Sequence, residues 1–260
     1  IQPDIVHTHL IHADLFGLIA AKLAGVKTVI TSRHNDDSFR YHPVVRMGSR
    51  VMWWLADGGI AISGAIRKFV IEVEGASPDK VAVVRYGLPY CWKTDDEIQS
   101  ARHAIRDELG MNDDAVILGM VCRLVEQKGI GYALEAFKKL YETFPDAYLV
   151  IAGDGELAQI LQSKAEMLGI AERVHWLGWR DDAQTIMTAL DIFLLPSLWE
   201  GFGLVLLAGM EKRVPIVASR VSAIPEIVQH GETGLLVTPR DVDQLQTSIA
   251  YLLDDRPLRK

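Results

Sequence analysis

Two basic residues lie five positions apart where a buried strand is expected to give way to a helix. Arg123 and Lys128 belong to the segment C-R-L-V-E-Q-K-G at residues 122–129, which follows the apolar run at residues 115–121. The first turn of a helix presents unpaired N–H groups and attracts anions, and two cations add to this attraction. The spacing therefore predicts a site for a diphosphate group. A pair of solvated loop charges is the alternative.

A second segment joins a carboxylate to two glycines at the start of an apolar helical pattern. It reads Glu200-Gly201-Phe202-Gly203-Leu204 and follows the apolar run at residues 192–195. Glycine lets a ligand approach the backbone closely, and the N–H groups of a helix start can face a phosphate or a sugar. Glu200 would accept hydrogen bonds from sugar hydroxyls. A glutamate that only caps the helix is the alternative.

A third turn contains glycines but is better interpreted as architecture. Gly153-Asp154-Gly155 follows the apolar run at residues 147–152. It lacks the third glycine of the G-x-G-x-x-G fingerprint, and no such fingerprint follows the first expected strand of either half. A nicotinamide-dependent dehydrogenase is therefore disfavoured. The segment predicts a tight turn from strand to helix.

The strands and helices on either side must position these three loops. Short apolar runs alternate with helical patterns along the chain. This alternation is typical of βα units and parallel sheets, so the fold class is α/β. Ligands bind beyond the carboxyl ends of the strands of such sheets. Strands are expected at residues 4–8, 27–31, 59–62, 81–85, 115–121, 147–152, 174–177, 192–195, 216–218 and 235–237. Helices in the first half are expected at residues 13–24, 44–55 and 64–73, with Leu15, Leu18, Ile19 and Leu23 on one face of the first.

A polar stretch separates the two series of strands. It contains Pro89, the cluster at residues 94–97 and a turn at residues 110–113. We expect one domain at residues 1–90, a linker at residues 91–112 and a second domain at residues 113–260. The second series matches a complete doubly wound domain, and the first is shorter.

Composition narrows the class of protein. The chain has 260 residues, of which 49% are hydrophobic and 23% are charged, which is typical of a globular protein with a large core. Cys91 and Cys122 make no disulfide framework, so a reducing cytosol is expected. No apolar run approaches the ~20 residues of a membrane span. The net charge of -7 arises in residues 101–260, which argues against nucleic acid as a partner.

The order of the motifs resembles the family 4 retaining glycosyltransferases of GT-B type. The second half contains R-L-x-x-x-K-G, G-D-G, E-G-F-G-L, P-E-I-V at residues 225–228 and G-E-T-G-L-L-V at residues 231–237. In the first half, P-D-I-V-H-T-H from Pro3, V-I-T-S-R-H-N from Val29, A-I-S from Ala61 and V-R-Y-G-L from Val84 are similar to the later part of that family's acceptor domain. The resemblance implies two Rossmann-like domains that face a cleft, the first of them incomplete.

The resemblance also implies an activity. Such an enzyme moves a hexosyl group from a UDP- or GDP-sugar to a glycan, a lipid-linked acceptor or a small molecule, as in polysaccharide or lipopolysaccharide biosynthesis. It needs no metal or other cofactor beyond the nucleotide-sugar donor. The anomeric configuration is retained by same-face attack, in which a donor phosphate oxygen helps to take the acceptor's proton.

The matching positions carry expected roles. Arg123 and Lys128 would bind the donor diphosphate and stabilise the departing nucleotide. Glu200, the first glutamate of an E-x7-E motif, would hold hydroxyls of the donor sugar, and His34 would face the reacting centre. The remaining donor-binding positions are Gly201, Phe202, Gly203, Leu204 and Ala208.

One of these positions departs from the family pattern. Ala208 stands where the second glutamate of E-x7-E usually binds the ribose hydroxyls. Loss of such a charged hydrogen bond costs about 1.5 to 3 kcal/mol of donor affinity. Glu211 lies one helical turn further on and would have to reach back to replace it. A weakly active or inactive relative that binds sugar nucleotides or glycans is therefore the alternative function.

Two further patterns have alternative interpretations. His7, His9 and His12 could suggest a metal site, but no cysteine or acidic partner completes a set at the usual spacing, and we expect no metal.

Arg40, Arg46 and Arg50 flank the apolar stripe of residues 44–54, as in a basic helix that lies on an anionic membrane. A helix packed on the sheet is the alternative. We expect the protein to be cytoplasmic. If the basic helix lies on a membrane, the protein would also contact the inner face of the cell membrane.

The chain begins at Ile1, in the middle of a strand pattern. By analogy with a complete doubly wound domain, we expect that about 80 residues precede it and that a crossover helix follows Lys260. We further expect weak donor binding, little turnover and an exposed apolar sheet edge in the first half.

Overall fold

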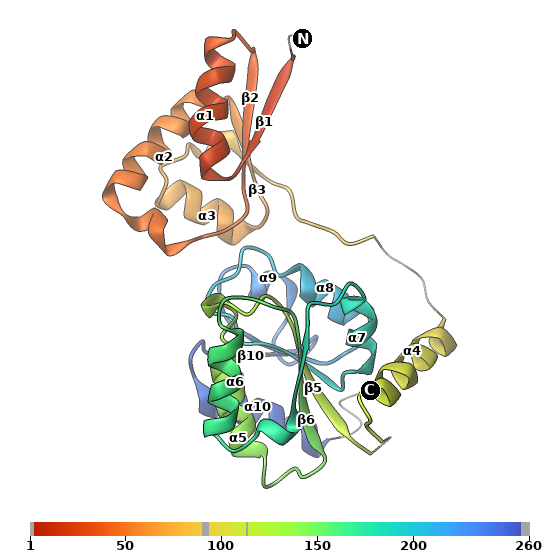
Figure 1. The fold of residues 1–260 in the computed structure, drawn as a ribbon. Helices are drawn as coiled ribbons and strands as arrows, with labels where there is room; N and C mark the ends of the chain where they lie inside the picture. The colour runs from red at the N-terminus through yellow and green to blue at the C-terminus, as the bar shows by residue number, and fades with distance from the viewer. Residues whose placement is uncertain (1–2, 90–93, 113, 256–260) are drawn as a thin grey trace. The chain divides into compact units, whose positions relative to one another are not determined.

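Two compact units make up the structure. The computed structural model describes residues 3–89, 94–112 and 114–255. Contacts group Ile1–Gly87 with Trp199–Gly203 in the first unit, and Leu88–Leu198 with Leu204–Lys260 in the second. Each unit contains its own parallel sheet (Figure 1). Cys91, the start of the expected linker, Asp113 and the last five positions of the second domain lie outside the described residues.

The first unit is a four-stranded parallel sheet with helices in the crossovers, in the order β1-β2-β3-β4. All its strand pairs are parallel and helices lie in the crossovers, which confirms the α/β class. Its strands are β1 (Ile5–His9), β2 (Thr28–Arg33), β3 (Gly58–Ala61) and β4 (Val81–Val83), and its helices are α1 (Leu10–Leu23), α2 (Pro43–Leu55) and α3 (Gly64–Glu72).

The buried face of α1 differs from the predicted one. Asp14, Leu18 and Ala21 are its buried residues, and Leu18 joins Val29 and Met52 in a core cluster. The expected apolar face is mostly open: Leu15, Ile19 and Leu23 are 44%, 40% and 85% exposed. Because α1 is apolar on nearly every side, periodicity alone does not select the buried face.

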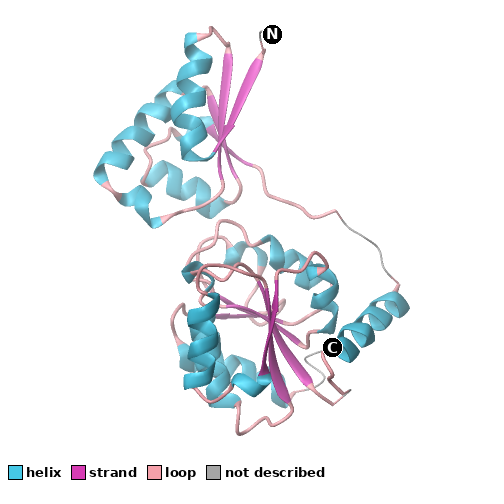
Figure 2. Cartoon of the chain, viewed as in Figure 1, coloured by secondary structure: helices cyan, strands magenta, loops and turns pink. Residues whose placement is uncertain are grey.

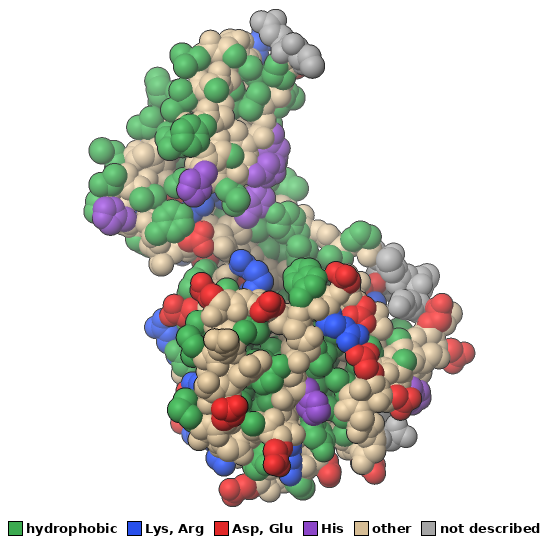
Figure 3. Space-filling view, in the orientation of Figure 1, with side chains coloured by type: hydrophobic (Ala, Val, Ile, Leu, Met, Phe, Trp, Pro, Cys, Tyr) green, Lys and Arg blue, Asp and Glu red, His purple; other side chains and the backbone are tan. Residues whose placement is uncertain are grey.

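Helix α2 also carries exposed apolar side chains. Met52 and Trp53 are buried, whereas Val44, Met47 and Trp54 are 65%, 66% and 77% exposed. Hydrophobic side chains, drawn green, are prominent on the visible face of this unit (Figure 3). The stripe is therefore divided between core and surface.

The second unit is a six-stranded parallel sheet covered by helices on both faces (Figure 2). Its strands are β5 (Val116–Val121), β6 (Ala147–Ala152), β7 (Val174–Gly178), β8 (Ile192–Leu195), β9 (Ile216–Ser219) and β10 (Leu235–Val237). Its helices are α4 (Asp95–Glu108), α5 (Ile130–Leu140), α6 (Ala158–Met167), α7 (Ala183–Ala189), α8 (Leu204–Glu211), α9 (Ile224–Ile227) and α10 (Val242–Asp254).

The strand order of this sheet marks where a ligand can bind. The order is β10-β9-β8-β5-β6-β7. The chain first adds β6 and β7 on one side of β5, and then adds β8, β9 and β10 on the other side. In a doubly wound sheet the crevice lies beyond the carboxyl ends of the two strands where the order reverses. Those strands are β5 and β8, and the segments that contain Arg123 and Glu200 follow them directly.

Helix α4 occupies most of the range that the sequence suggested as a linker. Thr94 and Glu97 form a reciprocal capping box at its start, which fixes the amino end of the helix. Arg102 and Arg106 contact Asp191 at 2.5 Å and 2.7 Å, so the helix is tied to the residue that precedes β8.

No helix in the described ranges is long and apolar enough to span a membrane.

Candidate active site

The loop that contains Arg123 is held in place by the neighbouring strand end. Cys122 donates its backbone N–H to Ala152 O at 3.0 Å, and Leu124 donates to Asp154 O at 2.8 Å. The backbone on either side of Arg123 is therefore fixed, while the Arg123 side chain itself is exposed. An exposed guanidinium on an anchored loop is available to a ligand in solution.

The glycine turn after β6 makes this anchoring possible. Gly153 has φ +139°, and a Cβ atom there would lie 1.9 Å from Cys122 O. A side chain at Gly155 would meet Leu124 O at 2.5 Å. Both glycines allow two loops to pack closely, which supports the interpretation of this segment as a tight turn.

Lys128 lies at the start of α5, as the sequence predicted. It ends a short 3-10 helix at Glu126–Lys128, and Gly129 follows with φ +64°. A Cβ atom on Gly129 would lie 2.0 Å from Pro196 O, and Leu198 donates its N–H to Gln127 O at 2.8 Å. The α5 start is thus packed against the end of β8. The segments that follow β5 and β8 therefore contact each other, and the half-buried Lys128 lies in the first of these segments.

A cavity of about 180 Å³ opens at the carboxyl ends of β5, β6 and β7. Arg123, Asp154, Trp179 and Arg180 are among its lining residues. A larger cavity of about 670 Å³ lies at the opposite edge of the sheet, against α4. None of the predicted site residues lines this larger cavity. Its lining residues Arg102 and Arg106 contact Asp191, and these contacts attach α4 to the rest of the unit.

The second predicted segment is shared between the two units. Glu200, Gly201, Phe202 and Gly203 group with the first unit, and all four are buried. Leu204 begins α8 and belongs, with Arg123, Lys128 and Ala208, to the second unit. The structure therefore distributes the predicted donor residues over both units.

Ala208 lies inside the core of the second unit. It is 5% exposed and packs in the cluster that contains Leu206 and Phe193. Glu211, the residue that could have replaced the missing glutamate, has its carboxylate 3.1 Å from Lys212 Nζ. Because this contact engages Glu211 with its neighbour, it does not support compensation for Ala208.

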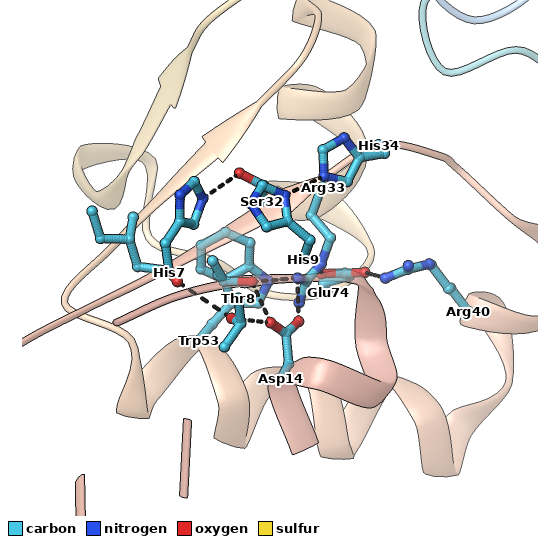
Figure 4. A network of polar contacts seen from close by, with 12 residues as sticks. His7, Thr8, His9, Asp14, Ser32, Arg33, His34, Arg40, Trp53 and Glu74 are labelled. Carbon is cyan, nitrogen blue, oxygen red and sulfur yellow. Dashed lines mark hydrogen bonds and ion pairs between the residues drawn. The ribbon is translucent and has the colours of Figure 1, made fainter. Parts of the chain in front are cut away.

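His34 follows β2 in the first unit and is bonded through both ring nitrogens. Its Nε2 lies 2.9 Å from His9 Nδ1, and its Nδ1 is hydrogen-bonded to the Tyr86 hydroxyl. The His34 ring stacks on those of His9 and Tyr86, with centroids 5.2 Å and 5.9 Å away. His7 lies beside His9 at 4.2 Å between ring centroids, and its Nε2 is 2.7 Å from Ser32 Oγ (Figure 4). We call His7, His9, His34 and Tyr86 the ring cluster.

The surroundings of His7 and His34 disfavour protonation of these two rings. Burial lowers the pKa of His34 below its usual value, and the charges of His9, Arg33, His7 and Arg40 lower it further. Burial and His9 also lower the pKa of His7, although Asp14 acts in the opposite direction. Burial raises the pKa of the Tyr86 phenol. At neutral pH the His34 imidazole and the phenol are therefore uncharged.

A buried charged network fixes the residue next to His34 (Figure 4). Arg33, which is 1% exposed, is ion-paired with Asp14, and its Nε donates to Glu74 Oε2 at 2.8 Å. Glu74 also accepts from Trp53 Nε1 at 2.7 Å and from Arg40 at 2.5 Å. Two guanidinium groups are thus balanced by two carboxylates, as burial of charge requires.

Sequence reasoning missed this network, and it changes the interpretation of Arg40. Arg40 was considered as a membrane-facing cation, but it is 2% exposed and paired with Glu74. Arg46 donates to Val73 O at 3.2 Å, so of the three arginines Arg50 has the exposed side chain. An acidic residue at position 14 on an otherwise apolar helix was the available signal.

His12 is exposed on α1, apart from this cluster of side chains. Within the described residues, no group of three or more histidine, cysteine, aspartate or glutamate side chains could hold a metal ion.

Comparisons with known proteins agree with these observations. The family model for glycosyl transferases group 1 matches residues 101–260, and that for glycosyltransferase family 4 matches residues 1–89. The Escherichia coli UDP-Gal:alpha-D-GlcNAc-diphosphoundecaprenol alpha-1,3-galactosyltransferase is 29% identical over 98% of this chain and 67% of its own length. An uncharacterised glycosyltransferase of Methanocaldococcus jannaschii is 30% identical over 99% of this chain and 68% of its own length.

Solved structures show the same architecture. Anabaena HepE in complex with UDP has a TM-score of 0.85 and 25% identity, and the match covers 97% of this chain and 70% of HepE. The HepE complex with UDP-glucose gives the same TM-score and identity. The chain thus spans about two thirds of the length of these relatives. With family models matched on both halves and the two parallel sheets of the GT-B fold, the chain belongs to the glycosyl transferases group 1, a family of glycosyltransferases.

Proposed function

We propose that the protein is a retaining glycosyltransferase that transfers a hexosyl group from a nucleoside-diphosphate sugar. The observation that carries this proposal is the position of Arg123 and Lys128 at the switch point of the second unit. Arg123 follows β5 and Lys128 precedes α5, and backbone hydrogen bonds hold this segment to the ends of β6 and β8. One cation after a strand and one before a helix, in a segment that glycines pack closely against its neighbours, suit a diphosphate.

A uridine donor is favoured over a guanosine donor. The E. coli relative is named for UDP-galactose, and HepE was solved with UDP and with UDP-glucose. We propose that Arg123 and Lys128 stabilise the negative charge that develops on the departing UDP. The donor phosphate would take the acceptor's proton on the same face as the leaving group, so the reaction would require neither a metal nor a separate protein base.

The remaining predicted residues complete this proposal. Glu200 would accept hydrogen bonds from the donor hexosyl group, and the backbone of residues 201–204 would line the sugar and phosphate. His34 would face the reacting centre from the first unit. The acceptor would be a glycan, a small molecule or a lipid-linked sugar. The last class is favoured because the E. coli relative is named for a diphosphoundecaprenol acceptor.

Titration calorimetry with UDP and GDP tests the donor site. We expect UDP to bind, and Arg123→Ala or Lys128→Ala to weaken binding about tenfold to hundredfold, since each removes a charge-assisted hydrogen bond. Lys139→Ala is the matched control, because Lys139 lies on α5 with its side chain 50% exposed and paired with Asp243. Unchanged UDP affinity in both site variants would overturn the proposal.

A weakly active or inactive binding protein is the second candidate, and the alanine at position 208, in place of a glutamate, favours it. In this case the ribose lacks a carboxylate partner, and donor turnover is low. Ala208→Glu should then raise UDP affinity and the release of UDP from UDP-sugars about tenfold. Leu207→Glu is the matched control, because it adds the same charge one position away. If wild type already turns over donors rapidly and Ala208→Glu is neutral, this candidate is excluded.

Peripheral membrane contact in a cytoplasmic setting remains a separate proposal. The exposed Val44, Met47 and Trp54 side chains on α2 support it, whereas the engagement of Arg40 and Arg46 within the unit leaves Arg50 as its cation. Flotation with anionic vesicles at low salt tests it. Met47→Ser with Trp54→Ser should abolish flotation, and absence of wild-type flotation ends the idea.

A further inference from the structure

The connection from β2 to α2 contains a loop that begins with His34 and ends at position 39, and we call it the 34–39 loop. Inside it, the side-chain amide of Asn35 donates to Asp37 Oδ1 at 2.9 Å. The next residue after the loop, Arg40, donates its backbone N–H to Asp37 O at 3.1 Å. These two bonds shape the loop, but they do not attach it to the rest of the first unit.

Buried arginines flank the 34–39 loop on both sides. Arg33 ends β2 and is 1% exposed, and Arg40 follows the loop and is 2% exposed. Both side chains reach the same carboxylate, but they use different oxygens. Arg33 Nε donates to Glu74 Oε2 at 2.8 Å, and Arg40 Nη1 donates to Glu74 Oε1 at 2.5 Å (Figure 4). A single side chain thus joins the two ends of the loop.

The backbone around Glu74 is fixed independently of the two arginines. Val73 and Ala76, on either side of it, donate their N–H groups to carbonyl oxygens of α3 at 2.8 Å and 3.0 Å. Gly75 has φ +76°, and a Cβ atom there would lie 2.8 Å from Arg50 Cγ, so the turn after α3 is closely packed. The Glu74 carboxylate therefore offers the loop a fixed point of attachment.

The two ends of the loop depend on Glu74 to different degrees. Arg33 belongs to β2, which pairs with strands on both sides, and its side chain also pairs with the buried Asp14 on α1. Arg40 Nε lies 4.0 Å from Asp37, but Asp37 belongs to the loop itself. The Arg40–Glu74 pair therefore attaches the far end of the loop to the unit.

We propose that Glu74 is a positioning residue, which closes the 34–39 loop and thereby holds His34 in place for sugar transfer. This inference rests on the proposed function, in which His34 would face the reacting centre. His34 is the first residue of the loop, and a loop that moved would carry it away from its bonds to His9 and Tyr86. A buried, charge-assisted pair suits this role, because it restricts the loop before any ligand binds.

Hydrogen exchange of the chain without ligand tests whether Glu74 closes the loop. Arg40→Lys keeps the charge but loses the planar fork that fits a carboxylate, and Arg40→Met removes both. We expect amide exchange in peptides of residues 34–42 to accelerate about tenfold in Arg40→Met and less in Arg40→Lys, with the strands of the unit unchanged. Trp53→Phe is the matched control, because Trp53 Nε1 donates to Glu74 Oε2 at 2.7 Å from the other end of α2. It should leave exchange in the loop unchanged.

Two results of this comparison would overturn the proposal. If exchange in the loop is unchanged in Arg40→Met, Glu74 does not close the loop. If Trp53→Phe accelerates it equally, Glu74 only stabilises the unit as a whole. Should circular dichroism show that Arg40→Met does not fold, Arg40→Lys compared with Trp53→Phe decides by the same criteria. None of these results depends on donor binding.

Release of UDP from UDP-glucose tests whether closure of the loop matters for transfer. We expect Arg40→Lys to lower kcat about tenfold through misplacement of His34, and Trp53→Phe to leave kcat unchanged. UDP affinity should not change in either variant, because Arg123 and Lys128 belong to the second unit. A loosened loop with unchanged kcat would overturn the positioning role. Wild-type protein that releases no UDP would instead refute the proposed function, and the exchange experiment would then decide the closure of the loop by itself.

Discussion

Buried charged side chains in the first unit are paired with opposite charges, which avoids the cost of burying a charge alone. Arg33 and Arg40 are almost fully buried, and their charges are matched by Asp14 and Glu74 rather than by solvent. Glu74 is the centre of the arrangement, because it accepts from both arginines and from Trp53. Removal of one partner from such a network leaves the other charges uncompensated.

Glu74→Gln should therefore destabilise the first unit strongly. We expect the free energy of unfolding to fall by about 3 to 5 kcal/mol, as measured by urea titration followed through circular dichroism. Glu72→Gln is the matched control, because Glu72 ends α3 two positions away and is exposed. It should change stability by no more than about 0.5 kcal/mol. Equal effects of the two variants would contradict the assigned role of Glu74.

Sequence reasoning selects candidate residues within one segment more readily than contacts between distant segments. Arg123 and Lys128 could be selected as candidates because both lie within one strand-to-helix segment, and the structure places that segment at the switch point. The Arg33–Glu74 contact joins residues 41 positions apart, and no local pattern encodes it. The ring cluster was similarly hidden, because His9, His34 and Tyr86 meet only when β1, β2 and the segment after β4 align.

At the scale of elements, strands were more predictable than helix faces. The strands of both units lie within about two residues of the expected ranges. In the second unit, strands such as β8 and β9 are buried along their whole length and appear in the sequence as short apolar runs. Sheet order could not be read from the sequence, since pairing depends on contacts between distant segments. Periodicity did not select the buried face of α1, because both of its sides are apolar.

The end of α8 contains a conformation that arginine adopts at a cost. Arg213 has φ +57°, its N–H bonds to Met210 O at 3.0 Å, and Val214 N–H bonds to Gly209 O at 3.0 Å. These two bonds define a Schellman motif, in which glycine is the preferred residue at the left-handed position. The Arg213 ion pair with Asp95 is 3.4 Å long, and both side chains are more than two thirds exposed, so it adds little.

Arg213→Gly should therefore stabilise the second unit. Removal of the strained left-handed conformation of arginine raises the free energy of unfolding by roughly 1 to 2 kcal/mol. The greater conformational freedom of glycine in the unfolded chain lowers it by about 0.4 to 1 kcal/mol. We expect a net gain of about 0.5 to 1 kcal/mol in urea unfolding. Arg220→Gly is the control: Arg220 is exposed and is not among the described residues with positive φ, so this variant should only lose stability. A loss at Arg213 as well would contradict the argument.

At the scale of the whole molecule, histidine burial couples stability to pH in both units. The pKa values of His7 and His34 in the first unit are lowered from 6.5, with burial as the main cause. In the second unit, burial lowers the pKa of His175. Lowered carboxylate pKa values, such as that of Asp57 beside Lys22, act only at more acid pH, where this stabilising contribution is lost. The histidines therefore dominate the window between about pH 5 and 7.

The sign of the effect follows from which state binds more protons. Because the folded pKa of each histidine lies below its unfolded value, the unfolded chain takes up protons first as the pH falls through 6.5. Stability should thus be highest above about pH 7 and decline until the pH passes the lowered folded values, where the loss is complete. Urea titrations at pH 7, 6 and 5 measure this slope. His34→Gln and His175→Gln should each make it shallower, because a glutamine takes up no proton, and the double variant should flatten it most. A slope that is unchanged in the double variant would show that other groups govern acid stability.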